Sequence, residues 1–307
     1  MYERFYGLQE RPFDLSPNPR FLCFTAQHRE ALAHLEYGLA GRPGVTVLVG
    51  EAGTGKTTLV RKALQASSDL STIVHLTNPT LTRAEFFEYL AHSFGFSAEA
   101  GRSKVQFLRE LEHALNNPIG PRLALVVDEA QSVPYELLEE IRLLTNAESN
   151  SGRSLAVVLA GQPELARRLD EARLRQLKQR VVLRCELTPL SLKDTASYIH
   201  ARVRTAGGEA TQLFTRDAVV AIHQHSNGIP RVISVICDNA LVNGFAADQK
   251  PVGASAVHEV CKSLSLPLHE SPQVAPPAPI GAVTPAVEEP RSPMFASGGR
   301  LRRFSFF

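Results

Sequence analysis

One stretch near the start of the chain decides the fold: Gly50-Glu51-Ala52-Gly53-Thr54-Gly55-Lys56-Thr57. It fits the pattern GxxxxGK[ST], and it lies between a short apolar run, 45–49, and a segment with helical periodicity that starts at Lys56. Glycines let the backbone curl so that successive N–H groups point inward and hold phosphate oxygens, helped by the positive end of the following helix. The sequence therefore predicts a phosphate-binding loop between a strand and a helix.

The loop also predicts roles for single residues. We expect Lys56 to reach the β- and γ-phosphates of a nucleotide and the Thr57 hydroxyl to coordinate Mg²⁺. The predicted nucleotide contacts are the whole quoted loop, 50–57, and the next residue, Thr58.

A second motif follows the continuous apolar run 123–127, which is typical of a strand buried on both faces. The run ends in Asp128-Glu129. A carboxylate at the end of a buried strand is costly without a cation partner, so we expect Asp128 to join Thr57 around Mg²⁺. Glu129 is then placed to polarise the attacking water as general base. The adjacent glutamate, and the absence of an NKxD motif from the sequence, favour ATP over GTP as the nucleotide.

Two further positions are candidates for the site. Gln162 directly follows the apolar run 155–160, and strand ends line the ligand crevice of parallel sheets, so it is expected to sense the γ-phosphate or orient water. The alternative is a polar helix cap before Pro163. Arg231 stands in the first turn of a predicted helix, where it opposes the helix dipole, and a bound phosphate would help to explain it. The alternative is a surface arginine.

A basic cluster lies between these positions: Arg167, Arg168, Arg173, Arg175, Lys178, Arg180 and Arg184. Most charge runs are solvated helix faces. One arginine of this cluster is expected to project into the site of a neighbouring subunit and stabilise transition-state charge. Arg180 is the first choice and Arg175 the second.

Strand and helix patterns divide the chain into four parts. Strand patterns at 45–49, 72–76, 123–127, 155–160 and 181–187 alternate with helical patterns through 41–190, which predicts an α/β fold with a parallel sheet covered on both sides. Only helical patterns follow in 191–264, which predicts a small all-helical lid. Residues 1–40 hold aromatics and helix-breaking prolines, followed by a helix capped by Thr25, and are expected to pack on the core. The proline-rich residues 265–307 predict a disordered tail.

Composition excludes several classes of protein. The formal net charge of the 307-residue chain is +2, which gives no general argument for nucleic acid or membrane binding. The four cysteines form no CxxC pair, so reduced thiols are expected. The amino-terminal residues have no signal-peptide pattern, and every apolar run is far shorter than the roughly 18 residues of a membrane span. We therefore expect a cytoplasmic protein, with peripheral attachment to the inner membrane as an option.

The motifs taken together resemble the AAA+ ATPases of the ExeA/GspA secretion kind, which are related to the MshM, TniB and MuB ATPases. The resemblance covers about 1–264 and rests on the phosphate loop, DEAQ at 128–131, GQPEL at 161–165, LKQR at 177–180, GIPR at 228–231 and the aromatic segment 6–21. It implies a P-loop NTPase (ASCE/AAA+) αβα sandwich with a helical lid. It further implies Gln162 as sensor 1, Arg231 as sensor 2, an arginine finger near Arg180, an adenine pocket framed by the amino-terminal segment, and a homo-oligomer.

The resemblance leaves the pathway open. Secretion members of this kind carry a membrane helix and a peptidoglycan-binding domain after the ATPase part, and residues 265–307 show neither. The first hypothesis is an ATPase that drives assembly of a secretion, pilus or exopolysaccharide export system, with the basic-aromatic end 300–307 docking on a membrane component. The alternatives are a DNA-associated ATPase of the transposition target-selector type and a nucleotide-gated switch with little turnover. Near-neutral charge disfavours DNA.

Overall fold

The computed structural model describes residues 1–15, 19–21, 25–40, 44–67, 71–77, 79–147 and 152–267. The tail that the sequence predicts to be disordered lies outside the described residues from 268 onward, and so does its basic-aromatic end, 300–307.

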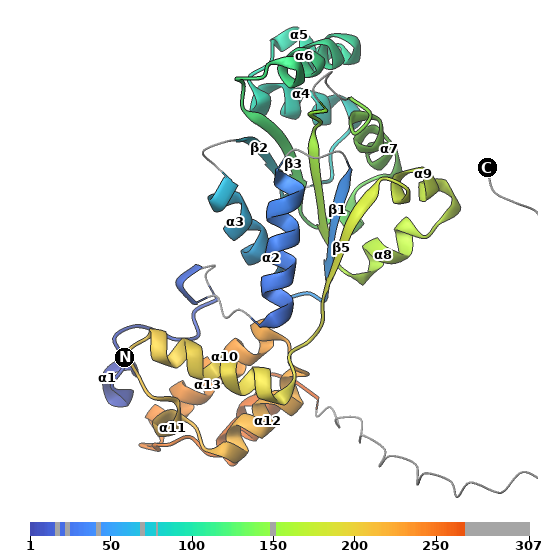
Figure 1. Ribbon diagram of the computed structural model, residues 1–307. Coiled ribbons are helices and arrows are strands. Elements are labelled where there is room, and N and C mark those ends of the chain that lie inside the picture. Colours follow the sequence, from blue (N-terminus) through green and yellow to red (C-terminus); the bar gives the residue numbers. More distant parts are fainter. Residues whose placement is uncertain are drawn as a thin grey trace, which may run out of the picture. The chain divides into compact units, whose positions relative to one another are not determined.

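A five-stranded parallel sheet forms the centre of the larger part of the chain (Figure 1). Its strands are β1 (Val45–Gly50), β2 (Ser71–Leu76), β3 (Arg122–Val127), β4 (Ala156–Gly161) and β5 (Val181–Leu187), in the order β2-β3-β4-β1-β5. Both β1 and β4 are buried at every residue, because they are central strands with helices on both faces. The predicted α/β class and parallel sheet are confirmed.

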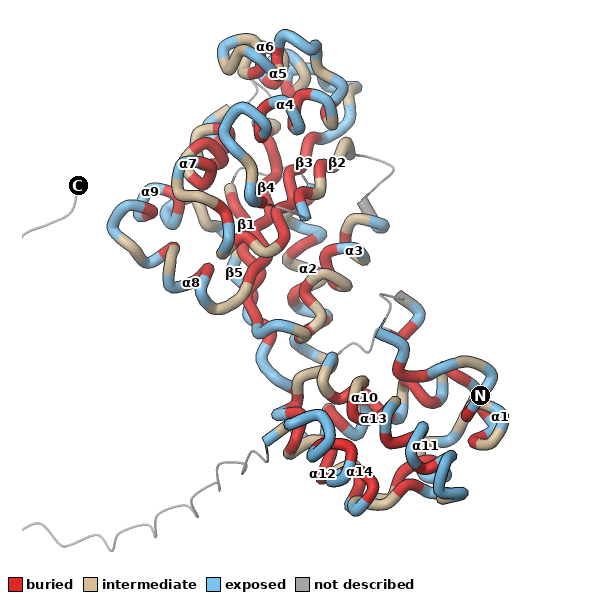
Figure 2. The backbone as a smooth tube through the Cα atoms, turned by 180° about the vertical axis from the view of Figure 1, so that it is seen from behind, coloured by how far each residue is buried: buried red, intermediate tan, exposed pale blue. Residues whose placement is uncertain are grey.

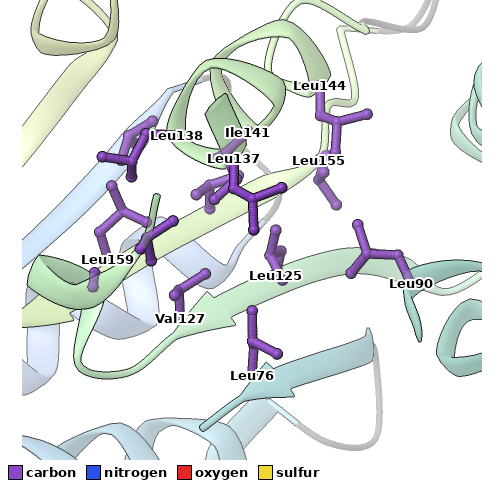
Figure 3. Packing of buried hydrophobic residues seen from close by; sticks show 14 of the residues in the cluster. Leu76, Leu90, Leu125, Val127, Leu137, Leu138, Ile141, Leu144, Leu155 and Leu159 are labelled. Carbon is purple, nitrogen blue, oxygen red and sulfur yellow. The ribbon is translucent and has the colours of Figure 1, made fainter. Parts of the chain in front are cut away.

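Two hydrophobic clusters cover the two faces of this sheet. On one face, α2 (Ala26–Leu39) and α3 (Lys56–Ser67) pack on alternate strand residues such as Leu48 and Val126. On the other face, the alternate residues, such as Val47 and Leu125, contact a second set of helices. That set is α4 (Arg83–Phe94), α6 (Lys104–Asn116), α7 (Tyr135–Leu144), α8 (Pro163–Leu169) and α9 (Arg175–Lys178), with the short α5 (Ala98–Arg102) beside α4 and α6. Figure 3 shows how leucines of α7 meet those of the strands.

The third cluster belongs to the helices after the sheet, which we call the lid: α10 (Leu192–Thr205), α11 (Ala210–Leu213), α12 (Arg216–Ser226), α13 (Pro230–Ala246) and α14 (Ala254–Ser263). Figure 2 shows their buried residues as a group separate from those of the sheet. Among the described residues, no helix combines the length and the apolar character needed to cross a lipid bilayer.

The amino-terminal aromatics were expected to pack on the core of the sheet, and the structure places them elsewhere. The segment forms two short helices, α1 (Glu3–Tyr6) and η1 (Pro19–Phe21), and its side chains enter the core of the lid. Of the described residues among 1–40, those of α2 pack on the sheet. Arg202 of α10 ties the segment down, because its Nε donates to the carbonyl of Pro12 over 2.6 Å and its Nη2 to that of Asp14 over 3.0 Å.

Candidate nucleotide-binding site

Three strand ends bring the predicted motifs together. Strands β3, β4 and β1 are neighbours and run parallel, so their carboxyl ends meet at one edge of the sheet. The phosphate loop follows β1, the Asp128-Glu129 pair follows β3, and Gln162 follows β4. This order places the loop, the two carboxylates and the glutamine at a single site.

The phosphate loop depends on glycine where the backbone turns. Gly53 has φ 85° and Gly55 has φ 101°, values that side chains rarely allow. Lys56 is 5% exposed, and its Nζ donates to the carbonyl oxygens of Gly50 over 2.7 Å and of Glu51 over 3.0 Å. Burial lowers the pKa of the Lys56 ammonium, and the nearby carboxylates act against this shift. The lysine therefore lies across the loop, where phosphate oxygens can replace the carbonyls.

The two predicted magnesium ligands contact each other. The Thr57 hydroxyl donates to Oδ2 of Asp128 over 2.7 Å, and Asp128 is 4% exposed. A hydroxyl and a buried carboxylate at the mouth of a phosphate loop suit Mg²⁺, which is usually held by one or two protein oxygens together with waters and phosphates. The residues present therefore fit the predicted ion.

Glu129 has an unusual backbone and two amide partners. Its φ of 50° and ψ of 39° lie in the left-handed region, at the start of η3 (Ala130–Ser132). Its Oε2 accepts from Nε2 of Gln131 over 2.5 Å and from Nε2 of Gln162 over 3.3 Å. The Gln162 side chain makes no capping hydrogen bond to α8, so the geometry favours the predicted site role over the alternative of a helix cap.

The lid contacts the phosphate loop directly. The backbone N–H of Arg231 donates to the carbonyl of Gly53 over 3.2 Å, and a Cβ at Gly53 would lie only 2.7 Å from Cβ of Arg231. The turn that precedes α13 requires Gly228, which has φ 70° and whose Cβ would lie 2.1 Å from the carbonyl oxygen of Leu190. Arg231 therefore stands at the loop, as the sequence predicts.

A cavity of about 490 Å³ joins these residues. Phosphate-loop residues, Glu129 and Arg231 line this cavity. Further residues from the amino-terminal part of the chain and the lid complete the lining, among them Phe21, His28, Tyr198 and Arg202. Its size and its mixture of apolar and polar walls suit a nucleotide.

Sequence reasoning missed His28 as a cavity residue. Its Nε2 lies 3.3 Å from the carbonyl oxygen of Thr54 and its Nδ1 lies 2.6 Å from Oγ1 of Thr25. A carbonyl only accepts, so Nε2 carries the proton and Nδ1 accepts from the threonine hydroxyl. Burial lowers the pKa of the His28 imidazole, which favours this neutral form. The one feature of the sequence that pointed to His28 was its position three residues after the predicted helix cap, Thr25.

Sequence reasoning also missed Gln131 and Arg168. Gln131 is the last residue of the DEAQ motif, and its side chain reaches Glu129. Arg168 was counted with the solvated basic cluster, yet it donates to the carbonyl oxygens of Gln131 and Val133. The motif was a signal for Gln131, whereas nothing in the sequence separates Arg168 from its exposed neighbour Arg167.

The structure does not bring Arg180 or Arg175 to the phosphate loop of the same chain. Arg180 directly precedes β5, whose first residue pairs with Val45 at the amino end of β1, opposite to the loop. Its Nη2 donates to Oδ1 of Asn146. Arg175 is exposed at the start of α9. An arginine finger from either position would have to act on a neighbouring subunit, so this role stays a prediction.

The fold and the arrangement of the motifs define the class: a P-loop NTPase fold with an AAA domain. Residues 40–169 match the family model of the AAA domain. The chain is also 43% identical over 249 residues to General secretion pathway protein A of Aeromonas hydrophila, a match that covers 80% of this chain and 45% of that protein. Over these residues the chain is similar to the ExeA/GspA-like AAA+ ATPases. It spans less than half the length of this curated relative.

Solved structures support the fold alone. The Cdc6p protein of Pyrobaculum aerophilum aligns with a TM-score of 0.61 at 19% identity, over 82% of this chain and 70% of that chain. The ORC2 protein of Aeropyrum pernix aligns with a TM-score of 0.60 at 16% identity, over 83% of this chain and 71% of that chain. At such identities they carry no argument about substrate or partner.

Proposed function

We propose that this protein hydrolyses ATP with Mg²⁺ at the site described above. The observation that carries the proposal is that Glu129 directly follows the Mg²⁺ candidate Asp128 and lines the cavity together with Thr57 of the phosphate loop. Mg²⁺, held by Thr57 and Asp128, would neutralise charge on the β- and γ-phosphates. Adenine would occupy the part of the cavity lined by Phe21, His28 and Tyr198.

The chain's own residues supply the remaining steps. Lys56 exchanges its two carbonyl contacts for phosphate oxygens when the nucleotide binds. Glu129 accepts a proton from the attacking water, and Gln162 holds the water or the γ-phosphate in place. Arg231 contacts the phosphates from the lid, which couples the position of the lid to the state of the nucleotide.

We further propose that hydrolysis drives assembly or remodelling of a secretion, pilus or exopolysaccharide export system. Support comes from the identity to General secretion pathway protein A, over the part of that relative that this chain spans. The site would be completed at an interface between copies of the chain, with Arg180 or Arg175 as the finger. The partner would be an inner-membrane component of the export system, reached from the cytoplasm.

Steady-state ATP hydrolysis by the purified full-length chain tests this proposal. The assay contains Mg²⁺ at low salt, with and without duplex DNA. We expect measurable turnover that DNA does not change, and no turnover by the Lys56→Ala variant, which should also lose nucleotide affinity. Strong stimulation by DNA would instead support the alternative function, a DNA-associated ATPase of the transposition target-selector type. ATP binding without turnover would instead support a nucleotide-gated switch.

A further inference from the structure

A hydrogen-bonded network reaches from the Glu129 carboxylate to α8. We propose that Gln131 and Arg168 are positioning residues for Glu129: Gln131 holds the carboxylate through its side-chain amide, and Arg168 holds Gln131. The inference rests on the proposed function, in which Glu129 accepts the proton of the attacking water.

Both amides that contact Glu129 bind the same carboxylate oxygen. Gln131 and Gln162 donate to Oε2 over 2.5 and 3.3 Å. Glu129 also lines the cavity, so Oε1 is the oxygen left to accept a proton from a water molecule there. Two donors on one oxygen give the carboxylate a single orientation, and orientation of the base is a large part of its effect on rate.

The orientation of the Gln131 amide follows from its partners. Its Oε1 accepts from the backbone N–H of Gln162 over 3.0 Å, while its Nε2 faces the carboxylate. A carboxylate only accepts and an N–H only donates, so the amide fits in one way round. Gly161 leaves room for it, since a Cβ there would lie 2.7 Å from Oε1 of Gln131. The backbone at the end of β4 therefore fixes the orientation of the Gln131 amide.

Arg168 fixes the backbone that carries Gln131. Its Nη1 donates to the carbonyl of Gln131, and its Nη2 donates to that of Val133 over 2.8 Å. Its guanidinium also lies 4.3 Å from the centre of the Tyr135 ring, and the Tyr135 hydroxyl donates to Glu171 over 2.9 Å. A planar guanidinium suits such a two-carbonyl clamp, and a lysine ammonium does not.

The clamp matters because Glu129 has a strained backbone. A non-glycine residue in the left-handed region carries backbone strain and persists only where its surroundings hold it. Here the Glu129 N–H donates to Oδ1 of Asp128 over 3.0 Å on one side, and Arg168 clamps η3 on the other. Loss of the clamp would let this turn relax and move the carboxylate away from the water.

Gln131→Glu and Arg168→Lys test the proposal in the full-length chain. Gln131→Glu keeps the shape of the side chain and an oxygen for the Gln162 N–H, but it replaces the donor with a charged oxygen against Glu129. We expect each variant to lower kcat at least tenfold while the dissociation constant for ATP changes less than about twofold. Arg167→Ala is the matched control, since Arg167 is the exposed neighbour on α8 and pairs with Glu164 of the same helix.

Gln131→Ala and a double variant separate positioning from packing. If Gln131 served only to accept from Gln162, Gln131→Glu would turn over like the wild type and only Gln131→Ala would be slow; that result would overturn the proposal. Combined with Glu129→Gln, the Gln131→Glu change should add no further loss, because it acts through Glu129. If Glu129→Gln is slow while Gln131→Glu and Arg168→Lys turn over normally, this inference alone is rejected. Normal turnover by Glu129→Gln would reject the proposed function itself.

Discussion

At the scale of single residues, Gly53 serves two purposes. Its φ of 85° turns the phosphate loop, and the absence of a side chain lets α13 approach the loop backbone. The lid and the loop are therefore joined at the place where nucleotide phosphates are expected to bind.

Gly53→Ala is expected to weaken ATP binding at least tenfold, because the added methyl group would collide with Arg231. Gly95→Ala is the matched control, since its φ is 74° and nothing lies within 4 Å of the added Cβ. Both variants should lose about 1–2 kcal/mol of stability from the left-handed backbone. Calorimetric titration with a non-hydrolysable ATP analogue checks the difference, and equal affinities would contradict close contact of lid and loop.

Site residues were predictable where their role follows from a position next to a strand end. Lys56, Thr57, Asp128 and Glu129 stand at fixed spacings from apolar runs, and the parallel sheet brings those ends together. Arg168 could not be predicted, because its partners come from η3 and only the packing of α8 places it there.

At the scale of elements, Glu140 joins three helices on one face of the sheet. It belongs to α7, its side chain is 8% exposed, and it accepts from Arg83 of α4 over 2.7 Å and from Lys104 of α6 over 2.5 Å. A buried carboxylate is tolerated because these two cations satisfy both of its oxygens.

Glu140→Gln should lower the free energy of unfolding by about 1–3 kcal/mol, because the buried side chain loses the charge that pairs with two cations. The neighbouring Glu139→Gln is the matched control: that side chain is 46% exposed and pairs with Arg142 within the same helix. Its loss should stay below about 1 kcal/mol. Urea denaturation measures both, and equal losses would contradict the role of Glu140 in joining the helices.

The strands were predictable because β1, β3 and β4 are mostly continuous apolar runs of the right length, and β2 and β5 complete the alternation of strand and helix patterns. The short helices α5, α9 and α11 were not, since four or five residues hold too little periodicity to stand out. The sequence also could not predict where the amino-terminal aromatic side chains pack. Aromatic side chains require burial, but their sequence does not say which of two cores receives them, and here the lid does.

At the scale of the whole molecule, the cavity is built from three parts of the chain, while Arg180 and Arg175 stand away from it. If a subunit interface completes the site, the arginine of one copy serves the phosphate loop of the next. A subunit that lacks the arginine and a subunit that lacks the base could then form a complete site together.

Arg180→Ala should lower kcat at least tenfold by removing the finger, and mixing it with Glu129→Gln should restore activity. Each Arg180→Ala subunit keeps its own base, and an adjacent Glu129→Gln subunit supplies the arginine. If the two variants mix equally and at random in a head-to-tail assembly, about a quarter of the interfaces have both the base and the arginine. Hydrolysis by the mixture, compared with each variant alone, measures this. No gain on mixing would contradict a role of Arg180 across the interface, and the same test then applies to Arg175.

The central claim is that Glu129 activates water for ATP hydrolysis, and the Glu129→Gln variant tests it most directly. The measurement combines ATP affinity with single-turnover hydrolysis in the presence of Mg²⁺. We predict wild-type affinity and turnover at least tenfold slower, because a positioned base contributes about 10²–10⁴ in rate. Turnover at the wild-type rate in a variant that binds ATP normally would contradict the account.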